Sequence, residues 1–251
     1  MKKKRCTAIV LAAGSGRRMK SNVAKQYMLL QDKPLIWYAL DTIEKSSVID
    51  DCILVTGAED IAYAKEEIVA RYGFRKIDVV AAGGEQRYDS VWNALQVIAD
   101  GGLNVPNTDG FVFIHDGARP FLTEEILLRS YEAVQESGAC VAGMPVKDTV
   151  KIADEEGYAK QTPDRRSVWQ IQTPQVFGTQ LITEAYAALM QKKEEAAAGG
   201  IVITDDAMVV ENFTGHKVKL VQGSYENIKI TTPEDLLVAE VFLSKSGDAV
   251  R

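Results

Sequence analysis

Residues 7–25 read TAIVLAAGSGRRMKSNVAK, and this stretch decides the fold. Ala8 to Ala12 form a short apolar run, which is typical of a buried strand. Gly14-Ser15-Gly16 follows as a tight turn. A strand that ends in a glycine turn can bring free backbone N–H groups close to an anion. The turn taken alone is also compatible with a solvated loop behind a core strand.

The distribution of charge favours the anion-binding interpretation. The first 31 residues contain eight Lys and Arg and no acid, so the net charge of −6 combines +8 in this segment with −14 in the rest. Arg17, Arg18, Lys20 and Lys25 follow the glycine turn directly. A basic cluster on an acidic protein suits a small anionic ligand better than a nucleic acid. We therefore predict a phosphate-binding loop and no nucleic-acid partner.

Composition excludes several other classes of protein. No apolar run approaches the ~18 residues that a membrane-spanning helix needs, and the one behind the basic N-terminus is too short for a signal peptide. We therefore expect a cytoplasmic protein without a membrane partner. Cys6, Cys52 and Cys140 are far apart in strand-like runs, which predicts buried thiols. His115 and His216 do not complete a zinc site of the usual spacing with them.

Apolar strand patterns alternate with helical patterns along the first 145 residues. The predicted strands cover residues 8–12, 52–55, 77–82, 111–115 and 139–144, and the predicted helices cover 34–44, 61–72, 87–99 and 123–137. This alternation indicates βαβ units. The predicted fold class is therefore α/β, with a Rossmann-like, mostly parallel twisted sheet flanked by helices. In such sheets ligands bind beyond the carboxyl ends of the strands.

The alternation stops near residue 149. Residues 149–153 and 158–162 are short alternating runs around Asp154–Gly157, which predicts a β-hairpin. A two-stranded ribbon is only marginally stable alone, so we expect a dimerisation arm at about 147–172 within a single domain, 1–251. Beyond it, helices are predicted over 180–198, 204–211 and from 232, and strands over 217–221 and 227–230.

Polar motifs follow the predicted strands: Gly83–Arg87 the third, Asp116–Arg119 the fourth and Lys147–Thr149 the fifth. Met19 stands where a dinucleotide fingerprint has its third glycine, which makes a nicotinamide-dependent oxidoreductase a distant alternative. No GxxxxGK[ST] motif is present, which excludes a P-loop NTPase. Phosphoryl or nucleotidyl transfer remains, because it needs positioning and charge neutralisation rather than a protein nucleophile.

The motifs in their order resemble a known family. Leu11–Met19 followed by Lys25–Tyr27 is similar to the opening of sugar-phosphate nucleotidyltransferases. Further stretches narrow the resemblance to the 2-C-methyl-D-erythritol 4-phosphate cytidylyltransferase family over about residues 7–242: Gly83–Arg87 with Ser90, His115–Pro120, Pro145–Thr149, Gln172–Gln175 and Asn227–Lys229. The resemblance implies CTP and a sugar-alcohol phosphate as substrates, a Mg²⁺ requirement, and a homodimer whose hairpin arms reach into the partner's site.

The resemblance also implies roles for individual residues. It assigns nine residues to CTP: Ala12, Ala13, Gly14, Gly16, Arg18, Lys25, Gly84, Glu85 and Ser90. It assigns six to the acceptor: Asp116, Arg119, Thr149, Arg165, Thr173 and Lys229, of which Thr149 and Arg165 would act on the neighbouring subunit's substrate. The implied catalytic residues are Arg18, Lys25, Arg165 and Lys229. Magnesium would be held mainly by the CTP phosphates, with Asp116 as a possible ligand.

Two alternatives stay open at this point. A ribitol-5-phosphate cytidylyltransferase shares the glycine loop and the Asp-x-x-Arg-Pro segment. A non-catalytic nucleotide-binding module on the same fold belongs to a different class, and its sign would be the loss of Arg18 or Lys25, both of which are present. Asp205 and Asp206 are interpreted as helix caps rather than metal ligands.

Overall fold

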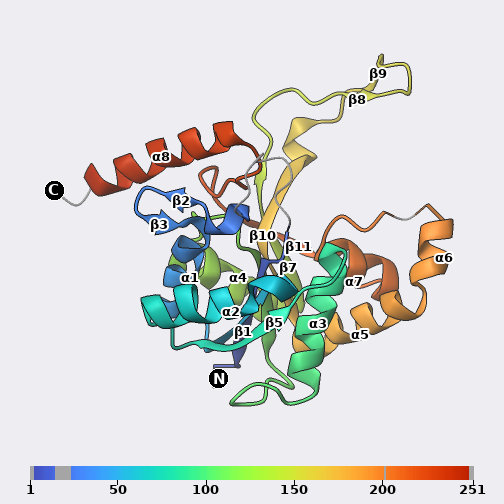
Figure 1. The fold of residues 1–251 in the computed structure, drawn as a ribbon. Coiled ribbons are helices and arrows are strands. Elements are labelled where there is room, and N and C mark those ends of the chain that lie inside the picture. Colours follow the sequence, from blue (N-terminus) through green and yellow to red (C-terminus); the bar gives the residue numbers. More distant parts are fainter. Residues whose placement is uncertain (1–2, 15–23, 201, 249–251) are drawn as a thin grey trace.

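A seven-stranded sheet forms the centre of the computed structural model, which describes residues 3–14, 24–200 and 202–248 (Figure 1). The strand order is β11-β7-β10-β6-β1-β4-β5. Strand β10 is antiparallel to both of its neighbours, and the other neighbouring pairs of this sheet are parallel. The predicted mostly parallel α/β fold is therefore confirmed. The seven strands are β1 (Cys6–Ala12), β4 (Asp51–Thr56), β5 (Ile77–Ala82), β6 (Phe111–Asp116), β7 (Ala139–Pro145), β10 (Trp169–Gly178) and β11 (Lys219–Gln222).

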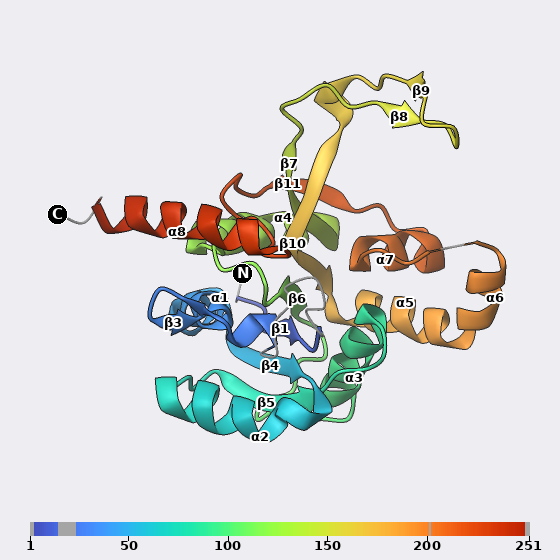
Figure 2. The ribbon, with the colours of Figure 1, turned by 45° about the horizontal axis from the view of Figure 1, so that its top comes forward.

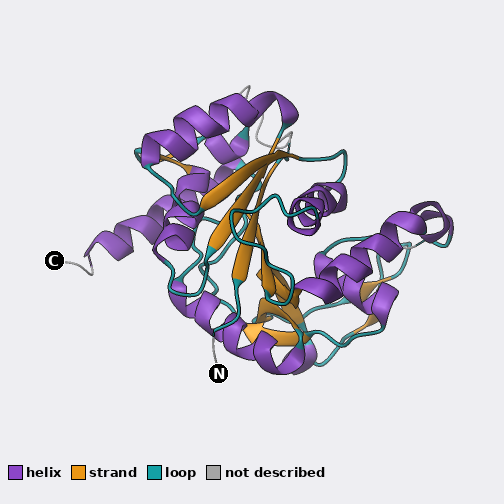
Figure 3. Ribbon diagram, turned by 90° about the horizontal axis from the view of Figure 1, so that it is seen from below, coloured by secondary structure: helices purple, strands orange, loops and turns teal. Residues whose placement is uncertain are grey.

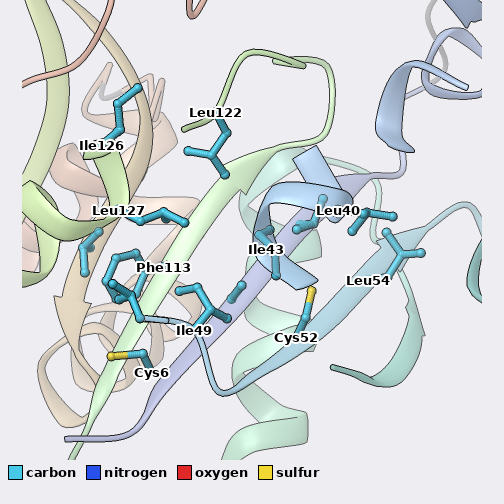
Figure 4. Close-up of a cluster of buried hydrophobic side chains, with 14 of the residues drawn as sticks. Cys6, Leu40, Ile43, Ile49, Cys52, Leu54, Phe113, Leu122, Ile126 and Leu127 are labelled. Atoms are coloured by element: carbon cyan, nitrogen blue, oxygen red, sulfur yellow. The ribbon is translucent and has the colours of Figure 1, made fainter. Parts of the chain in front are cut away.

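Helices cover both faces of the sheet (Figure 3). Successive strand residues point to opposite faces, so Val10 of β1 packs beneath α1 (Leu35–Lys45) and α4 (Glu124–Ser137) in one core, part of which Figure 4 shows. Ile9 belongs to the other core, together with α3 (Arg87–Ala99), α5 (Thr179–Gln191) and α7 (Asp206–Thr214). Because both faces of the sheet are covered by helices, the ends of the strands are left for ligands to bind.

The three cysteines are buried and free of disulfides, as predicted. Cys6 and Cys52 lie in the core of Figure 4. Burial raises the pKa of the Cys6 and Cys140 thiols to about 12, and it raises the pKa of Cys52 as well. These thiols therefore act as small apolar side chains.

Several elements differ from their predicted bounds. The predicted helix over 61–72 consists of a 3₁₀ turn (Ala58–Asp60), α2 (Ile61–Tyr63) and a π-helical segment (Ala64–Ala70). The predicted helix over 180–198 is divided into α5 and α6 (Lys193–Ala198), because Lys192 leaves helical geometry with φ −112° and ψ 13°. The last helix, α8 (Pro233–Asp248), begins at its proline as expected. A 3₁₀ turn (Lys25–Tyr27) and a small hairpin of β2 (Leu29–Leu30) and β3 (Lys33–Pro34) precede α1.

The strand predicted over 227–230 is wrong, because these residues follow a turn at Tyr225 and Glu226 and have no regular secondary structure. The backbone N–H of Asn227 donates to Ser224 O at 3.1 Å, and its side-chain amide donates to Thr173 O at 2.8 Å. Conversely, the sequence analysis missed β10. Pro174 and three glutamines made this segment look unlike a strand. In the structure Pro174 lies at the irregularity of the β10–β7 ladder, between Ile171 and Gln175.

The predicted hairpin is present and projects away from the sheet (Figure 2). It pairs β8 (Ile152–Ala153) with β9 (Ala159–Gln161), and every residue from 151 to 162 is exposed. A 3₁₀ turn (Arg165–Ser167) leads from it into β10. Within the described residues, none of the helices has both the length and the apolar character that crossing a membrane requires.

Candidate active site

A cavity of about 420 Å³ opens at the carboxyl edge of the sheet beside β1. The neighbours of β1 are β4 on one side and β6 on the other, so the chain reverses its order of strands here. Ligands bind at such switch points in open α/β sheets. The cavity is lined by the loops that follow β1, β5 and β6 and by a late loop: Leu11–Gly14, Lys25, Gln26, Gly84–Arg87, Ser90, Asp116, Ala118 and Lys229.

Glycines bring the first two of these loops together. A Cβ added to Gly83 would collide with the Cβ of Ala13, and one added to Gly84 would collide with the Cβ of Asp89. The backbone N–H of Gly84 donates to the hydroxyl of Ser90 at 3.1 Å. The β5–α3 loop is therefore packed against the β1 loop with its backbone exposed to the cavity, as a close-fitting ligand slot requires.

The residues after the glycine loop are also fixed. The side-chain amide of Gln26 donates to Ala12 O, and the ammonium of Lys25 donates to Ile230 O at 3.0 Å. The first bond holds this segment to the end of β1, and the second joins it to the late loop that carries Lys229. A cation is thereby held at the cavity from each of these two segments.

A second cavity, of about 240 Å³, adjoins the first. Its own lining comes largely from β10 and from the residues before α7: Arg119, Ile171, Gln172, Thr173, Gln175, Thr204 and Asp205. Arg87, Asp116 and Lys229 line both cavities and form the wall between them, which we call the shared wall. Two ligands bound side by side would meet at these three residues.

Asp116 is the charge centre of the shared wall and is only 7% exposed. Lys229 Nζ lies 2.8 Å from its Oδ2, Arg87 Nε lies 3.3 Å from its Oδ1, and Arg119 Nε lies 3.9 Å from its Oδ2. Burial opposes ionisation of the carboxyl, but these cations hold the pKa of Asp116 well below its usual range. The carboxylate is therefore ionised at neutral pH.

A buried histidine orients the backbone beside Asp116. His115 Nε2 donates to Arg119 O at 3.1 Å, because a carbonyl can only accept, and so Nδ1 accepts from the Thr173 hydroxyl at 3.0 Å. The Thr173 oxygen in turn accepts the backbone N–H of Asp116 at 3.1 Å. Burial lowers the pKa of His115 to about 4. A neutral His115 therefore fixes the end of β6 to β10.

The structure brings together most of the residues predicted for the site. The residues of the first cavity are Ala12, Ala13, Gly14, Lys25, Gly84, Glu85, Ser90, Asp116 and Lys229. Arg119 and Thr173 line the second cavity. Thr149 and Arg165 are exposed at the arm and line neither cavity of their own chain. Gly16 and Arg18 lie outside the described residues.

The sequence analysis gave no role to Arg87, although it lies in the quoted Gly83–Arg87 motif. The interpretation of Asp205 as a helix cap is confirmed, since its carboxylate accepts Met208 N–H at 2.9 Å. The same interpretation is wrong for Asp206, whose carboxylate pairs with Arg87 at 2.7 Å. Arg87 and Asp206 are far apart in the sequence, so only the folded chain reveals their ion pair.

The fold and the paired cavities with cationic walls define an α/β protein of the nucleotidyltransferase fold. The family model described as 2-C-methyl-D-erythritol 4-phosphate cytidylyltransferase matches residues 6–245, and the chain belongs to this family. A relative with that name from Lachnospira eligens is 49% identical over 237 residues, which is 94% of this chain and 98% of the relative. Another from Lachnoclostridium phytofermentans is 47% identical over 244 residues, covering 97% and 98%.

Solved structures show the same likeness. The crystal structure of a 4-diphosphocytidyl-2C-methyl-D-erythritol synthase from Anaerococcus prevotii superposes with a TM-score of 0.78 at 33% identity and covers 96% of this chain and 97% of that one. A 2-C-methyl-D-erythritol 4-phosphate cytidylyltransferase from Francisella tularensis gives a TM-score of 0.74 at 27% identity, covering 94% and 98%. The confirmed resemblance therefore extends over nearly the whole chain.

Proposed function

We propose that this chain transfers CMP from CTP to the phosphate of 2-C-methyl-D-erythritol 4-phosphate. The products are 4-CDP-2-C-methyl-D-erythritol and pyrophosphate, in the non-mevalonate route to isoprenoid precursors. Family membership supports the choice of substrates. The observation that carries the proposal is the shared wall, because Arg87, Asp116 and Lys229 face both cavities at the place where two phosphates would meet.

In the proposed reaction an oxygen of the acceptor phosphate forms a bond to the α-phosphorus of CTP. The bond from that phosphorus to the pyrophosphate oxygen breaks, and pyrophosphate leaves with the electron pair. Both reactants are anions, so cations must offset their repulsion and the charge that develops in the transition state. Lys25 and Lys229 line the CTP cavity, and we assign them and Arg18 to this task.

We assign the cytosine to the slot formed by Gly84, Glu85 and Ser90. The close approach of Gly83 to Ala13 leaves backbone groups as the natural partners of a planar base. Ala12, Ala13 and Gly14 border the same cavity and would let backbone amides reach the triphosphate. We assign the acceptor to the second cavity, where Arg119 and Thr173 lie.

Magnesium belongs to the proposal as a substrate-borne ion. Among the described residues there is no group of three or more His, Cys, Asp or Glu side chains that could hold a metal. Mg²⁺ commonly binds through substrate phosphates together with one or two protein carboxylates. Asp116 in the shared wall would be such a carboxylate. The bound ion would supply charge neutralisation on the triphosphate, while Asp116 and the lysines fix the position of the reactants.

We also propose a homodimer formed through the arm and a cytoplasmic location. Arg165 and Thr149 are exposed and line neither cavity of their own chain, and Tyr158 at the arm is 71% exposed. An arm inserted at a second subunit would cover these side chains and deliver Arg165 to the partner's acceptor. Mixing Lys25→Ala with Arg165→Ala chains tests this arrangement. Verified heterodimers should recover activity that neither variant has alone, and inactive heterodimers would refute the shared site.

Pyrophosphate release from CTP tests the reaction itself. The purified chain is offered 2-C-methyl-D-erythritol 4-phosphate and ribitol 5-phosphate in parallel, with Mg²⁺ present. We expect release with the first acceptor and a far lower rate with the second. A preference for ribitol 5-phosphate would replace the assigned substrate. Saturable CTP binding without release with either acceptor would indicate a non-catalytic module.

A further inference from the structure

The guanidinium of Arg87 is bound by the carboxylate of Asp206, which lines neither cavity. Its Nη1 and Nη2 donate to Asp206 Oδ1 and Oδ2 at 2.8 and 2.7 Å, which is a two-pronged pair. The Tyr186 hydroxyl donates to the same Oδ1 at 2.6 Å. Asp206 and Tyr186 are both 0% exposed. The pair therefore fixes the plane of the guanidinium from inside the protein.

Asp206 is itself immobilised at the beginning of α7. Its backbone N–H and that of Ala207 both donate to the side-chain oxygen of Gln175, at 3.0 and 2.9 Å. Gln175 belongs to β10 and lines the acceptor cavity. The helix, the reversed strand and Arg87 consequently form one connected unit.

The third nitrogen of this guanidinium, Nε, is directed at the shared wall. With both Nη atoms bound to Asp206, Nε points to Asp116 Oδ1 at 3.3 Å. The other oxygen, Oδ2, is bound to Lys229 at 2.8 Å. Each oxygen of Asp116 therefore has its own cation, and the carboxylate cannot rotate without losing one of them. Arg87 is already paired with two carboxylates, so it is suited to orienting Asp116 rather than to binding a phosphate.

We infer that Asp206, together with Tyr186, is a positioning residue of the proposed transfer, acting through Arg87 to fix Asp116 between the two substrates. The inference rests on the proposed function. The loss of Asp206 should affect the two substrates differently, because other hydrogen bonds hold the cytosine slot in place. Gln86 N–H is held by Asp89 Oδ2 at 2.9 Å, and Gly84 N–H is held by Ser90. Loss of Asp206 should disturb the acceptor and the chemical step while leaving CTP binding largely intact.

Asp206→Asn is the first test, because it keeps the shape of the side chain and removes the charge. We expect kcat/KM for the acceptor to fall about ten- to a hundredfold, which is the range for loss of one charge-assisted hydrogen bond. The KM for CTP should stay within about threefold. Arg87→Lys keeps the positive charge but cannot form the two-pronged pair with Asp206. It should likewise lower kcat/KM for the acceptor and leave the KM for CTP nearly unchanged.

Asp51→Asn is the matched control. Asp51 is also buried and paired with an arginine, Arg5, but it lies at the beginning of β4, at the opposite edge of the sheet. It should lower the melting temperature without moving either KM. Tyr186→Phe removes only the 2.6 Å bond and keeps the ion pair, so it serves if Asp206→Asn does not fold. Its own control is Tyr38→Phe, which removes a 2.6 Å bond to Leu30 O.

Three outcomes have different meanings. If wild-type protein releases no pyrophosphate with any acceptor, the proposed function fails and takes the inference with it. If wild-type protein is active, and folded Asp206→Asn and Tyr186→Phe both keep its acceptor kcat/KM, only the inference is overturned. Equal losses for CTP and acceptor, matched by Asp51→Asn, would show a merely structural role and would also overturn it.

Discussion

Acidification should destabilise this protein through one buried histidine. His115 is 1% exposed, and the neutral ring accepts from Thr173 and donates to Arg119 O. Protonation would turn Nδ1 into a donor, so the Thr173 hydroxyl would have to rotate and accept from it. That oxygen also accepts Asp116 N–H. Protonation would therefore force the Thr173 hydroxyl to reorient and would place a charge inside the protein, and burial is the main factor that opposes it.

The direction and size follow from the pKa of His115, which falls from 6.5 to about 4 on folding. Because the folded state binds its proton less readily, the histidine's contribution is fully present above pH 6.5 and is lost as the pH falls toward 4. The loss amounts to about 2 kcal/mol at pH 5 and about 3 kcal/mol when both states are protonated. Domains of this size have about 5–15 kcal/mol of stability in total.

Urea unfolding of wild type, His115→Gln and His216→Asn at pH 7.5, 6 and 5 measures this effect. The unfolding free energy of wild type should drop toward that of His115→Gln as the pH falls, so that the gap narrows by about 2 kcal/mol at pH 5. His216 is the second histidine of the chain, and His216→Asn is the control. Its unfolding free energy should change with pH in the same way as that of wild type. A gap between wild type and His115→Gln that stays constant with pH would refute the reasoning.

Three further predictions concern the reaction. Arg18→Ala should lower kcat by ~10²–10³, the usual cost of one transition-state donor, and unchanged turnover in single-turnover assays would remove Arg18 from the mechanism. Gly84→Ala should raise the KM for CTP at least about tenfold, because the new Cβ collides with Asp89; calorimetry showing normal CTP affinity would contradict the cytosine slot. EDTA should abolish pyrophosphate release reversibly and leave the melting temperature unchanged, since the described residues contain no metal-holding cluster; a lower melting temperature would point to a structural ion.

The strands of the sheet could be predicted where a strand is also a continuous apolar run in the sequence. Buried parallel strands such as β4 and β6 read as continuous apolar runs, which local sequence reveals. Strand β10 combines exposed and buried polar residues with Pro174, and its ladder with β7 is irregular. Its place in the sheet depends on pairing with β6 and β7, and no local period encodes that pairing.

The site was predictable to the extent that it lies in loops after strands. The carboxyl ends of parallel strands meet at one edge, so motifs behind β1, β5 and β6 converge there. The pairing of Arg87 with Asp206 was not predictable, because it connects elements more than a hundred residues apart. Asp206 follows a capping residue in an ordinary helix start, and only burial distinguishes it from a second surface acid.

The reversed strand explains why the two cavities and the arm lie at the same edge. Because β10 is antiparallel to β6 and β7, its first half lies at their carboxyl ends, where it places Thr173 beside Asp116. The chain that leads into β10 must then leave the sheet at that same edge, which is where the hairpin projects (Figure 2). A parallel strand in this position would have brought its preceding residues to the far edge. The direction of β10 thus supplies the wall of the acceptor cavity and also sends the arm outward beside it.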